Sequence, residues 1–214
     1  IMIRECATLE EFKEFSIRAG LKGDIEQVTH LDFPFLDNQK KYTFMSIPHY
    51  GKANQYNLLF LSKNKVIVYT DMPLNYNQSF KKILKEPYGE STAVTFSLLK
   101  GILKNYSSEF ERLRGVMNEL DISPAIEDVE KSGRALRRLT DRLEELVQLI
   151  ITLKERDIRE FNTELITFDY EILNGEARYW LERCRSHMYR IASLRTKSEM
   201  QSNRELNATM WRLT

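Results

Sequence analysis

Glycine, proline and cysteine are scarce in this chain, and each scarcity narrows the range of folds. Among 214 residues there are eight glycines, five prolines and two cysteines. Few glycines and prolines, together with 29% charged residues, favour long helices over an all-β fold. Because Cys6 and Cys184 lie far apart in sequence, the chain favours neither a disulfide framework nor a cysteine-based zinc site.

Long apolar runs and an excess of one charge are also missing. No run approaches the roughly 18 apolar residues of a membrane-spanning helix, and the first residues lack the pattern of a signal peptide. The formal net charge is +1, so the chain has no strong overall field toward nucleic acid. We expect the chain to form a soluble protein with one or two domains.

The sequence also lacks the motifs of common enzyme classes. It contains no Walker loop, no dinucleotide-binding glycine fingerprint and no nucleophile elbow. The three histidines, His30, His49 and His187, are scattered, and no two of them have the i, i+4 spacing of a helical metal site. We therefore expect neither an enzyme activity nor an organic cofactor.

The first 90 residues alternate short apolar segments with turn signals. Thr8-Leu9-Glu10-Glu11 is a capping box, which predicts a helix through Phe12 and Phe15 that ends at Gly20. The elements predicted after it are strands at residues 25–31, 42–47, 56–61 and 66–70, the last two as a hairpin, and a short helix at residues 80–84. The expected fold is α+β or α/β, with a small mixed sheet and short helices over residues 1–90.

Residues 91–162 are dominated by helical spacing of apolar side chains. Two seams with spacings of three and four run from Leu99 to Leu120 and from Leu136 to Leu153. Between them, Ser123-Pro124 suits the N-cap and first position of a new helix. Two seams joined by a tight turn predict an antiparallel helical hairpin over residues 91–162.

One very long helix is predicted over residues 163–214. At 1.5 Å per residue it would span about 75 Å, with Asn174-Gly175 as its only weak point. Basic residues dominate from Arg183 to Arg212, and we interpret them as a solvated face of the helix. The last residues contain no glycine, asparagine or proline stop signal, which indicates a stalk that continues into a missing segment.

The end of this helix resembles the cytoplasmic end of the stalk helix in CorA-like magnesium channels. The residues that carry the resemblance are Leu206, Asn207, Met210, Leu213 and Thr214, preceded by Ser202-Asn203. The order of parts and the strand–turn–strand at residues 59–66 are also similar to that family. There, a similar segment leads into the first transmembrane helix, and a Gly-Met-Asn signature follows. The resemblance implies a chain cut at the membrane boundary.

This resemblance implies the cytoplasmic regulatory domain of a magnesium or cobalt channel, gated by intracellular divalent cations. It implies Mg²⁺ as the transported and regulatory ion, with Co²⁺ or Zn²⁺ as alternatives. It also implies a homopentamer on the cytoplasmic side of the cell membrane, anchored by helices beyond residue 214. The isolated fragment need not reach that oligomeric state.

Two groups of site residues follow from the resemblance. Asp71, after the hairpin, and Asp169 and Glu171, early in the long helix, would be regulatory metal ligands between neighbouring protomers. The residues implied at the pore mouth are Asn207, Met210 and Thr214. Carboxylates that face each other across an interface repel, and a hard dication would relieve that repulsion. The plainer interpretation of the three acids is that they are ordinary surface carboxylates.

Two other functions stay open on the sequence. A ZntB-like zinc transporter shares the scaffold, and ion selectivity would lie largely in the missing pore. A soluble coiled-coil adaptor or nucleic-acid-binding protein could instead use the basic end of the long helix, with binding that falls steeply with salt. The channel interpretation requires no nucleic-acid partner.

Overall fold

The computed structural model describes residues 2–50, 56–76, 80–122, 125–156 and 158–213. The chain divides into two compact units, each made of two stretches of sequence. The first unit holds Ile1–Asn105 and Glu145–Ala177, and the second holds Tyr106–Glu144 and Arg178–Thr214. Each of the three long helices therefore contributes residues to both units.

A five-stranded mixed sheet lies in the first unit, in the order β1-β5-β4-β3-β2. Strand β1 (Met2–Cys6) pairs in parallel with β5 (Lys65–Tyr69), and the other pairs are antiparallel. These are β4 (Tyr56–Ser62), β3 (Tyr42–Pro48) and β2 (Phe35–Asn38). The β4–β5 hairpin, the strand that ends at Pro48 and the mixed sheet were all predicted correctly.

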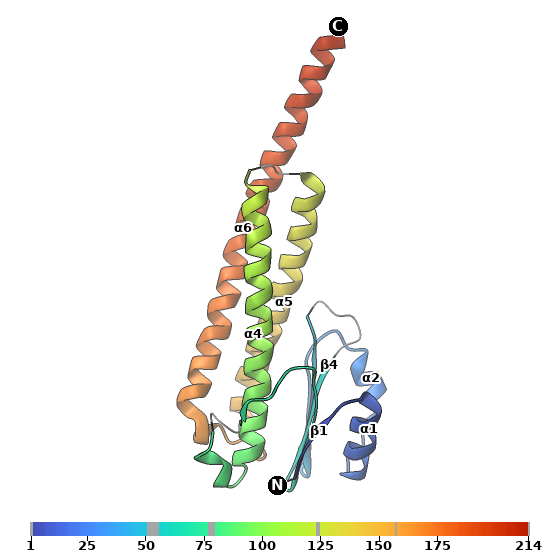
Figure 1. The fold of residues 1–214 in the computed structure, drawn as a ribbon, viewed down its shortest axis with the longest axis vertical. Helices are drawn as coiled ribbons and strands as arrows, with labels where there is room; N and C mark the ends of the chain where they lie inside the picture. Colours follow the sequence, from blue (N-terminus) through green and yellow to red (C-terminus); the bar gives the residue numbers. More distant parts are fainter. Residues whose placement is uncertain (1, 51–55, 77–79, 123–124, 157, 214) are drawn as a thin grey trace. The chain divides into compact units, whose positions relative to one another are not determined.

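Both faces of the sheet are covered, as the apolar runs predicted. On one face, Phe44 and Phe60 pack with Phe12 and Ile25, which come from α1 (Leu9–Arg18) and α2 (Ile25–Thr29) (Figure 1). On the other face Thr43 is fully buried, and its hydroxyl oxygen lies 3.4 Å from the Glu160 carboxylate. Burial on both faces explains why β3 and β4 are nearly continuous in apolar residues.

The capping box at the start of α1 is present. Thr8 Oγ1 accepts the backbone N–H of Glu11 at 3.2 Å, and the Glu11 carboxylate accepts the N–H of Ala7 at 2.9 Å. Two otherwise unpaired donors at the helix start are thereby satisfied. Gly20 adopts φ +106°, a left-handed conformation that suits glycine, directly after the helix.

The prediction of a strand over residues 25–31 is wrong, because this segment forms α2. Asp24 caps it by accepting the N–H of Glu26 at 2.9 Å. Its buried residues, Ile25 and Thr29, are four apart, and Gln27 between them is exposed, whereas one face of a strand would hold all three. The short helix expected at residues 80–84 is a single 3-10 turn, η1 (Ile83–Lys85).

Three long helices make up most of the remaining chain (Figure 1). They are α4 (Gly89–Leu120), α5 (Ile126–Glu155) and α6 (Thr167–Leu213), the last preceded by the 3-10 turn η2 (Thr163–Ile166). Helices α4 and α5 run antiparallel, and the predicted leucine seam from Leu136 to Leu153 is buried. Helix α6 continues without a break through Asn174-Gly175. The predicted cap at Ser123-Pro124 lies outside the described residues.

The start of α4 depends on a glycine. Tyr88 has φ 61°, which is uncommon for a residue with a side chain. The chain then passes so close to η1 that a Cβ on Gly89 would lie 1.6 Å from the carbonyl oxygen of Ile83. Only glycine fits there without a shift of the backbone.

Candidate functional site

Asp71 lies directly after β5, in a turn held by Thr70. The Thr70 hydroxyl donates to Asn57 Oδ1 at 2.7 Å and accepts the N–H of Met72 at 3.1 Å. The Asp71 carboxylate is about half exposed and lies 3.8 Å from Nε2 of His49, whose side chain is only 8% exposed. The predicted ligand is therefore accessible to solvent, and the imidazole that follows β3 lies beside it.

Asp169 and Glu171 lie in the first turns of α6, on either side of a buried tyrosine. Both carboxylates are exposed, and Glu171 forms an ion pair with Lys154 of α5. Tyr170 between them is buried, donates its hydroxyl to the carbonyl of Ile150, and packs against Phe161 with 5.7 Å between ring centroids. Tyr170 fixes the start of α6, so its two acidic neighbours are directed outward.

Burial raises the pKa of Tyr170 well above its ordinary value, and the negative charge of Glu171 adds to this rise. The phenol is therefore neutral throughout the physiological range. A neutral phenol keeps its hydrogen bond to the Ile150 carbonyl, which stabilises the pairing of α5 with the first turns of α6. The contact is structural and orients the carboxylates on either side.

The structure does not bring the three predicted ligands together into one site within the chain. Among the described residues, no group of three or more histidine, cysteine, aspartate or glutamate side chains lies close enough to hold a metal ion. Mg²⁺ prefers six oxygen ligands, several of them water, so a single exposed carboxylate makes only a weak site. The resemblance implies that these ligands lie between protomers, and that prediction stays open for Asp71, Asp169 and Glu171.

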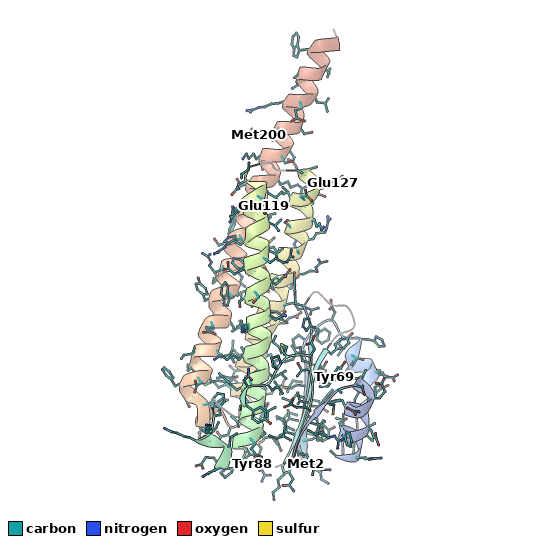
Figure 2. All side chains as sticks on the ribbon, viewed as in Figure 1. Met2, Tyr69, Tyr88, Glu119, Glu127 and Met200 are labelled. Atoms are coloured by element: carbon teal, nitrogen blue, oxygen red, sulfur yellow. The ribbon has the colours of Figure 1, made fainter. Side chains whose placement is uncertain are left out.

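The last part of α6 is an exposed helix. Every side chain from Glu199 to Ala208 is exposed, including the predicted pore-mouth residue Asn207. In Figure 2, Met200 lies on α6 beyond Glu119 of α4 and Glu127 of α5. Met210 is 59% exposed, and Thr214 lies outside the described residues. The pore-mouth role of Asn207, Met210 and Thr214 remains a prediction.

The basic stretch of α6 is not simply a solvated face. Arg185 pairs with Glu144 of α5 at 2.8 Å, and Arg190 pairs with Asp121 at the end of α4. These acids lie 41 and 69 residues earlier in sequence, so local charge patterns could not reveal them. The pairs neutralise cations that a nucleic-acid interface would need, and they fix α6 within the second unit.

Beneath these ion pairs, α6 contributes an apolar side to the core of the second unit. Cys184 is fully buried, and burial raises the pKa of its thiol to about 12. Trp180 packs on Phe110 of α4 with 5.6 Å between ring centroids. Leu181, Cys184 and Ile191 are buried, whereas Leu206 and Met210, further along the same helix, are exposed.

Comparison by sequence gives no relative. No family model matches the chain, and no curated protein matches it either. No helix in the described part of the chain is both long and apolar enough to cross a membrane.

Comparison by structure finds the same fold in several solved structures, and three of them have a TM-score of 0.67 each. The complete CorA magnesium transporter from Methanocaldococcus jannaschii is 13% identical, and the match covers 99% of this chain and 72% of that one. Full-length CmaX is 15% identical, with 99% and 70% covered. The ZntB cytoplasmic domain from Vibrio parahaemolyticus RIMD 2210633 is 10% identical, with 94% and 88% covered.

The match extends over nearly the whole chain, so it includes the sheet and the long helices together. At these identities the likeness establishes the fold and leaves the chemistry to be argued from this chain's own residues. The chain therefore has the CorA-like cytoplasmic-domain fold that the motif at the end of its long helix predicted.

Proposed function

We propose that this chain is the cytoplasmic, cation-responsive domain of a CorA-like transporter of divalent cations. The observation that carries the proposal is the likeness of fold over 99% of the chain to CorA and over 94% to the ZntB cytoplasmic domain. The proposed role is regulatory and includes no enzymatic step. In the assembled transporter the chain would form a homopentamer on the cytoplasmic side of the membrane.

The donor chemistry of the predicted ligands suits the proposed regulatory ion. Asp71, Asp169 and Glu171 all offer exposed carboxylate oxygens, which are the ligands that Mg²⁺ prefers. One chain does not gather them, so the proposed site needs carboxylates from neighbouring protomers. Repulsion between those carboxylates would open the ring at low Mg²⁺, and the bound ion would hold it closed.

Helix α6 supplies a path from the proposed metal site to the proposed pore mouth. Asp169 and Glu171 lie at its beginning and Asn207 near its end, on one unbroken helix from Thr167 to Leu213. A continuous helix that carries both sites can couple them, provided that the ion binds one position of the helix more tightly than another. This coupling is the proposed mechanism of gating.

Thermal unfolding in the presence of divalent ions tests the metal site. The chain is melted in MgCl₂, CoCl₂ and ZnCl₂, with NaCl at matched ionic strength as the control. Specific binding should stabilise the fold by about 1.4 kcal/mol at ten times the dissociation constant. The Asp71→Asn variant should lose most of this gain. Equal melting temperatures in MgCl₂ and NaCl for the pentameric protein would overturn the proposed site.

One observation favours the alternative that the domain responds to Zn²⁺ instead of Mg²⁺. His49 Nε2 lies 3.8 Å from Asp71, so a nearly buried imidazole lies beside a half-exposed carboxylate. Imidazole ligands suit Zn²⁺ and Co²⁺ better than Mg²⁺. Stabilisation by Zn²⁺ that is lost in His49→Gln, without a matching effect of Mg²⁺, would favour the zinc alternative.

Transport itself is tested on the full-length protein. Reconstituted in liposomes, it should admit Mg²⁺ or Co²⁺ down their gradients, and the flux should fall when the same ion is raised on the side that holds this domain. A full-length gene that lacks two apolar spans with Gly-Met-Asn between them would contradict the transporter assignment.

A further inference from the structure

His187 lies at the contact between α6 and α4 in the second unit. Its ring meets the ring of Phe110 edge-on, with 5.0 Å between centroids and 82° between planes. The side chain is partly buried, and Phe110 beneath it is completely buried. A titratable ring is thus part of the packing that joins two helices.

The hydrogen bond of His187 settles which nitrogen can gain a proton. Nδ1 lies 3.0 Å from the backbone carbonyl oxygen of Arg183, one turn earlier on α6. A carbonyl oxygen only accepts, so Nδ1 carries the hydrogen in the neutral ring. Acid therefore protonates Nε2 and makes the ring a cation.

The charged groups that act on this ring are all arginines. Arg183 and Arg190 approach it from α6, and Arg114 approaches it from α4. Arg114 is paired with Glu111 at 2.6 Å, and Arg190 is paired with Asp121. The acidic partners of these two arginines are thus held in ion pairs, and within the described part of the chain the charges that shift the pKa of His187 come from arginines.

Arg183 adds a cation that has no acidic partner in the described structure. Its guanidinium lies 5.8 Å from the centroid of the Phe110 ring, and its Nε is buried without a hydrogen bond. Phe110 thus lies next to a guanidinium and the ring of His187 at the same time. Protonation of His187 would place a second cation against the same aromatic side chain.

We propose that His187 makes the packing of α6 on α4 in the second unit sensitive to acid, because its protonation adds a positive charge beside three arginines in a partly buried contact. This inference concerns proton binding and does not depend on the proposed transport function. Loosening of this contact would release the part of α6 that follows it from α4.

The sign of the effect follows from the environment of the ring. Burial lowers the pKa of His187 and the three arginines lower it further, against the opposing effect of the Arg183 carbonyl. The unfolded chain, with an ordinary histidine pKa of about 6.5, therefore binds the proton more readily than the folded chain. The contribution of this contact to the free energy of unfolding is fully present above the pKa of the unfolded chain. It is lost as the pH falls below that value toward the lower pKa of the folded chain.

Histidine NMR titration of the whole chain tests the proposal directly. The Cε1–H resonance of His187, assigned with the His187→Asn variant, should titrate with a midpoint below about 6.5. The midpoint should rise in Arg183→Gln, which removes one of the three cations and keeps the backbone carbonyl. Arg185→Gln is the matched control, because Arg185 is on the same helix but pairs with Glu144 and Glu182. It should leave the midpoint unchanged.

Thermal unfolding between pH 7.5 and 5.0 tests the consequence for stability. Over this range the melting temperature of the unchanged chain should fall further than that of His187→Asn, whose side chain cannot titrate. If His187→Asn does not fold, Arg183→Gln replaces it and should show a smaller loss than the unchanged chain. A His187 midpoint at or above about 6.5, or equal losses in the chain and its variant, would overturn the proposal.

Discussion

Arg190 of α6 forms an ion pair with Asp121, the residue that follows the last turn of α4. The same guanidinium donates to Asn118 Oδ1 at 2.8 Å, and Lys197 Nζ donates to the backbone carbonyl of Asp121 at 2.6 Å. The end of a helix carries unpaired carbonyl groups and a partial negative charge. Two cations of α6 therefore bind the part of α4 that most favours cations.

The first prediction concerns this ion pair. Asp121→Asn keeps the shape and the backbone carbonyl but removes the charge that Arg190 binds. We expect the free energy of unfolding to fall by about 0.5–1 kcal/mol, because both side chains remain partly exposed and water screens the pair. Urea unfolding at low salt measures the change.

Glu199→Gln is the control for that measurement. Glu199 pairs with Arg195 on the same helix at 3.1 Å, so it joins no two elements. Its loss should cost about 0.3–0.5 kcal/mol. If Asp121→Asn lowers the free energy of unfolding no more than Glu199→Gln does, the ion pair between α6 and the end of α4 is no more stabilising than a pair within one helix.

The second prediction concerns the glycine at the start of α4. Gly89→Ala places a Cβ 1.6 Å from the Ile83 carbonyl oxygen, so the backbone must shift. We expect a loss of about 3 kcal/mol or more in the free energy of unfolding. Gly115→Ala is the matched control within the same helix, because a Cβ there meets nothing within 4 Å. That variant should gain up to about 1 kcal/mol.

Equal effects of the two glycine variants in chemical denaturation would contradict the close approach at Gly89. The comparison separates the two reasons for glycine in a helix. Gly115 is exposed and only lowers helix propensity, whereas Gly89 is required by its neighbour.

The local structure was predictable from sequence where one period was clear over a long enough run. The β4–β5 hairpin and the leucine seams of α4 and α5 satisfy that condition. Residues 25–31 do not, because five residues of helix and a short apolar strand look alike in sequence. Strands β1 and β2 were not predicted; β2 has only four residues, and both lie at the edges of the sheet.

The candidate site was less accessible to sequence reasoning than the fold. Asp71 and Glu171 were selected by resemblance, and only the structure shows that His49 lies beside one and Lys154 beside the other. The ion pairs of Arg185 and Arg190 reach acids on other helices. Side chains that meet only through tertiary packing have no characteristic spacing in the sequence, so a sequence pattern cannot predict their contacts.

The third prediction concerns Cys184. Its thiol is fully buried and burial raises its pKa to about 12, so almost no thiolate exists at pH 8. In a Cys6→Ala background, the folded chain should react with a thiol-specific reagent at least about 100 times more slowly than the unfolded chain. Rapid labelling without denaturant would contradict the burial of this face of α6.

The same labelling reaction reports on the second unit alone, because Cys184 belongs to that unit. Denaturant at concentrations below the global unfolding transition should accelerate the labelling of Cys184 if α6 separates locally from its neighbours.

The last prediction concerns the competition between a lysine and a metal ion for Glu171. Lys154 forms an ion pair with Glu171, so a cation bound by this carboxylate must displace the ammonium group or share the carboxylate with it. Lys154→Gln removes a positive charge next to the proposed site. We expect Mg²⁺ to bind the pentameric protein several-fold more tightly in this variant, since a like charge nearby opposes binding of the ion.

Lys81→Gln, which changes an exposed lysine before η1, should leave the affinity unchanged. Titration calorimetry gives both affinities at one ionic strength. If Lys154→Gln binds Mg²⁺ no more tightly than Lys81→Gln, Glu171 does not ligate the ion, and the proposed site must rely on Asp71 and Asp169. In that case Asp169→Asn should abolish the Mg²⁺-dependent gain in melting temperature, whereas Glu171→Gln should leave it intact.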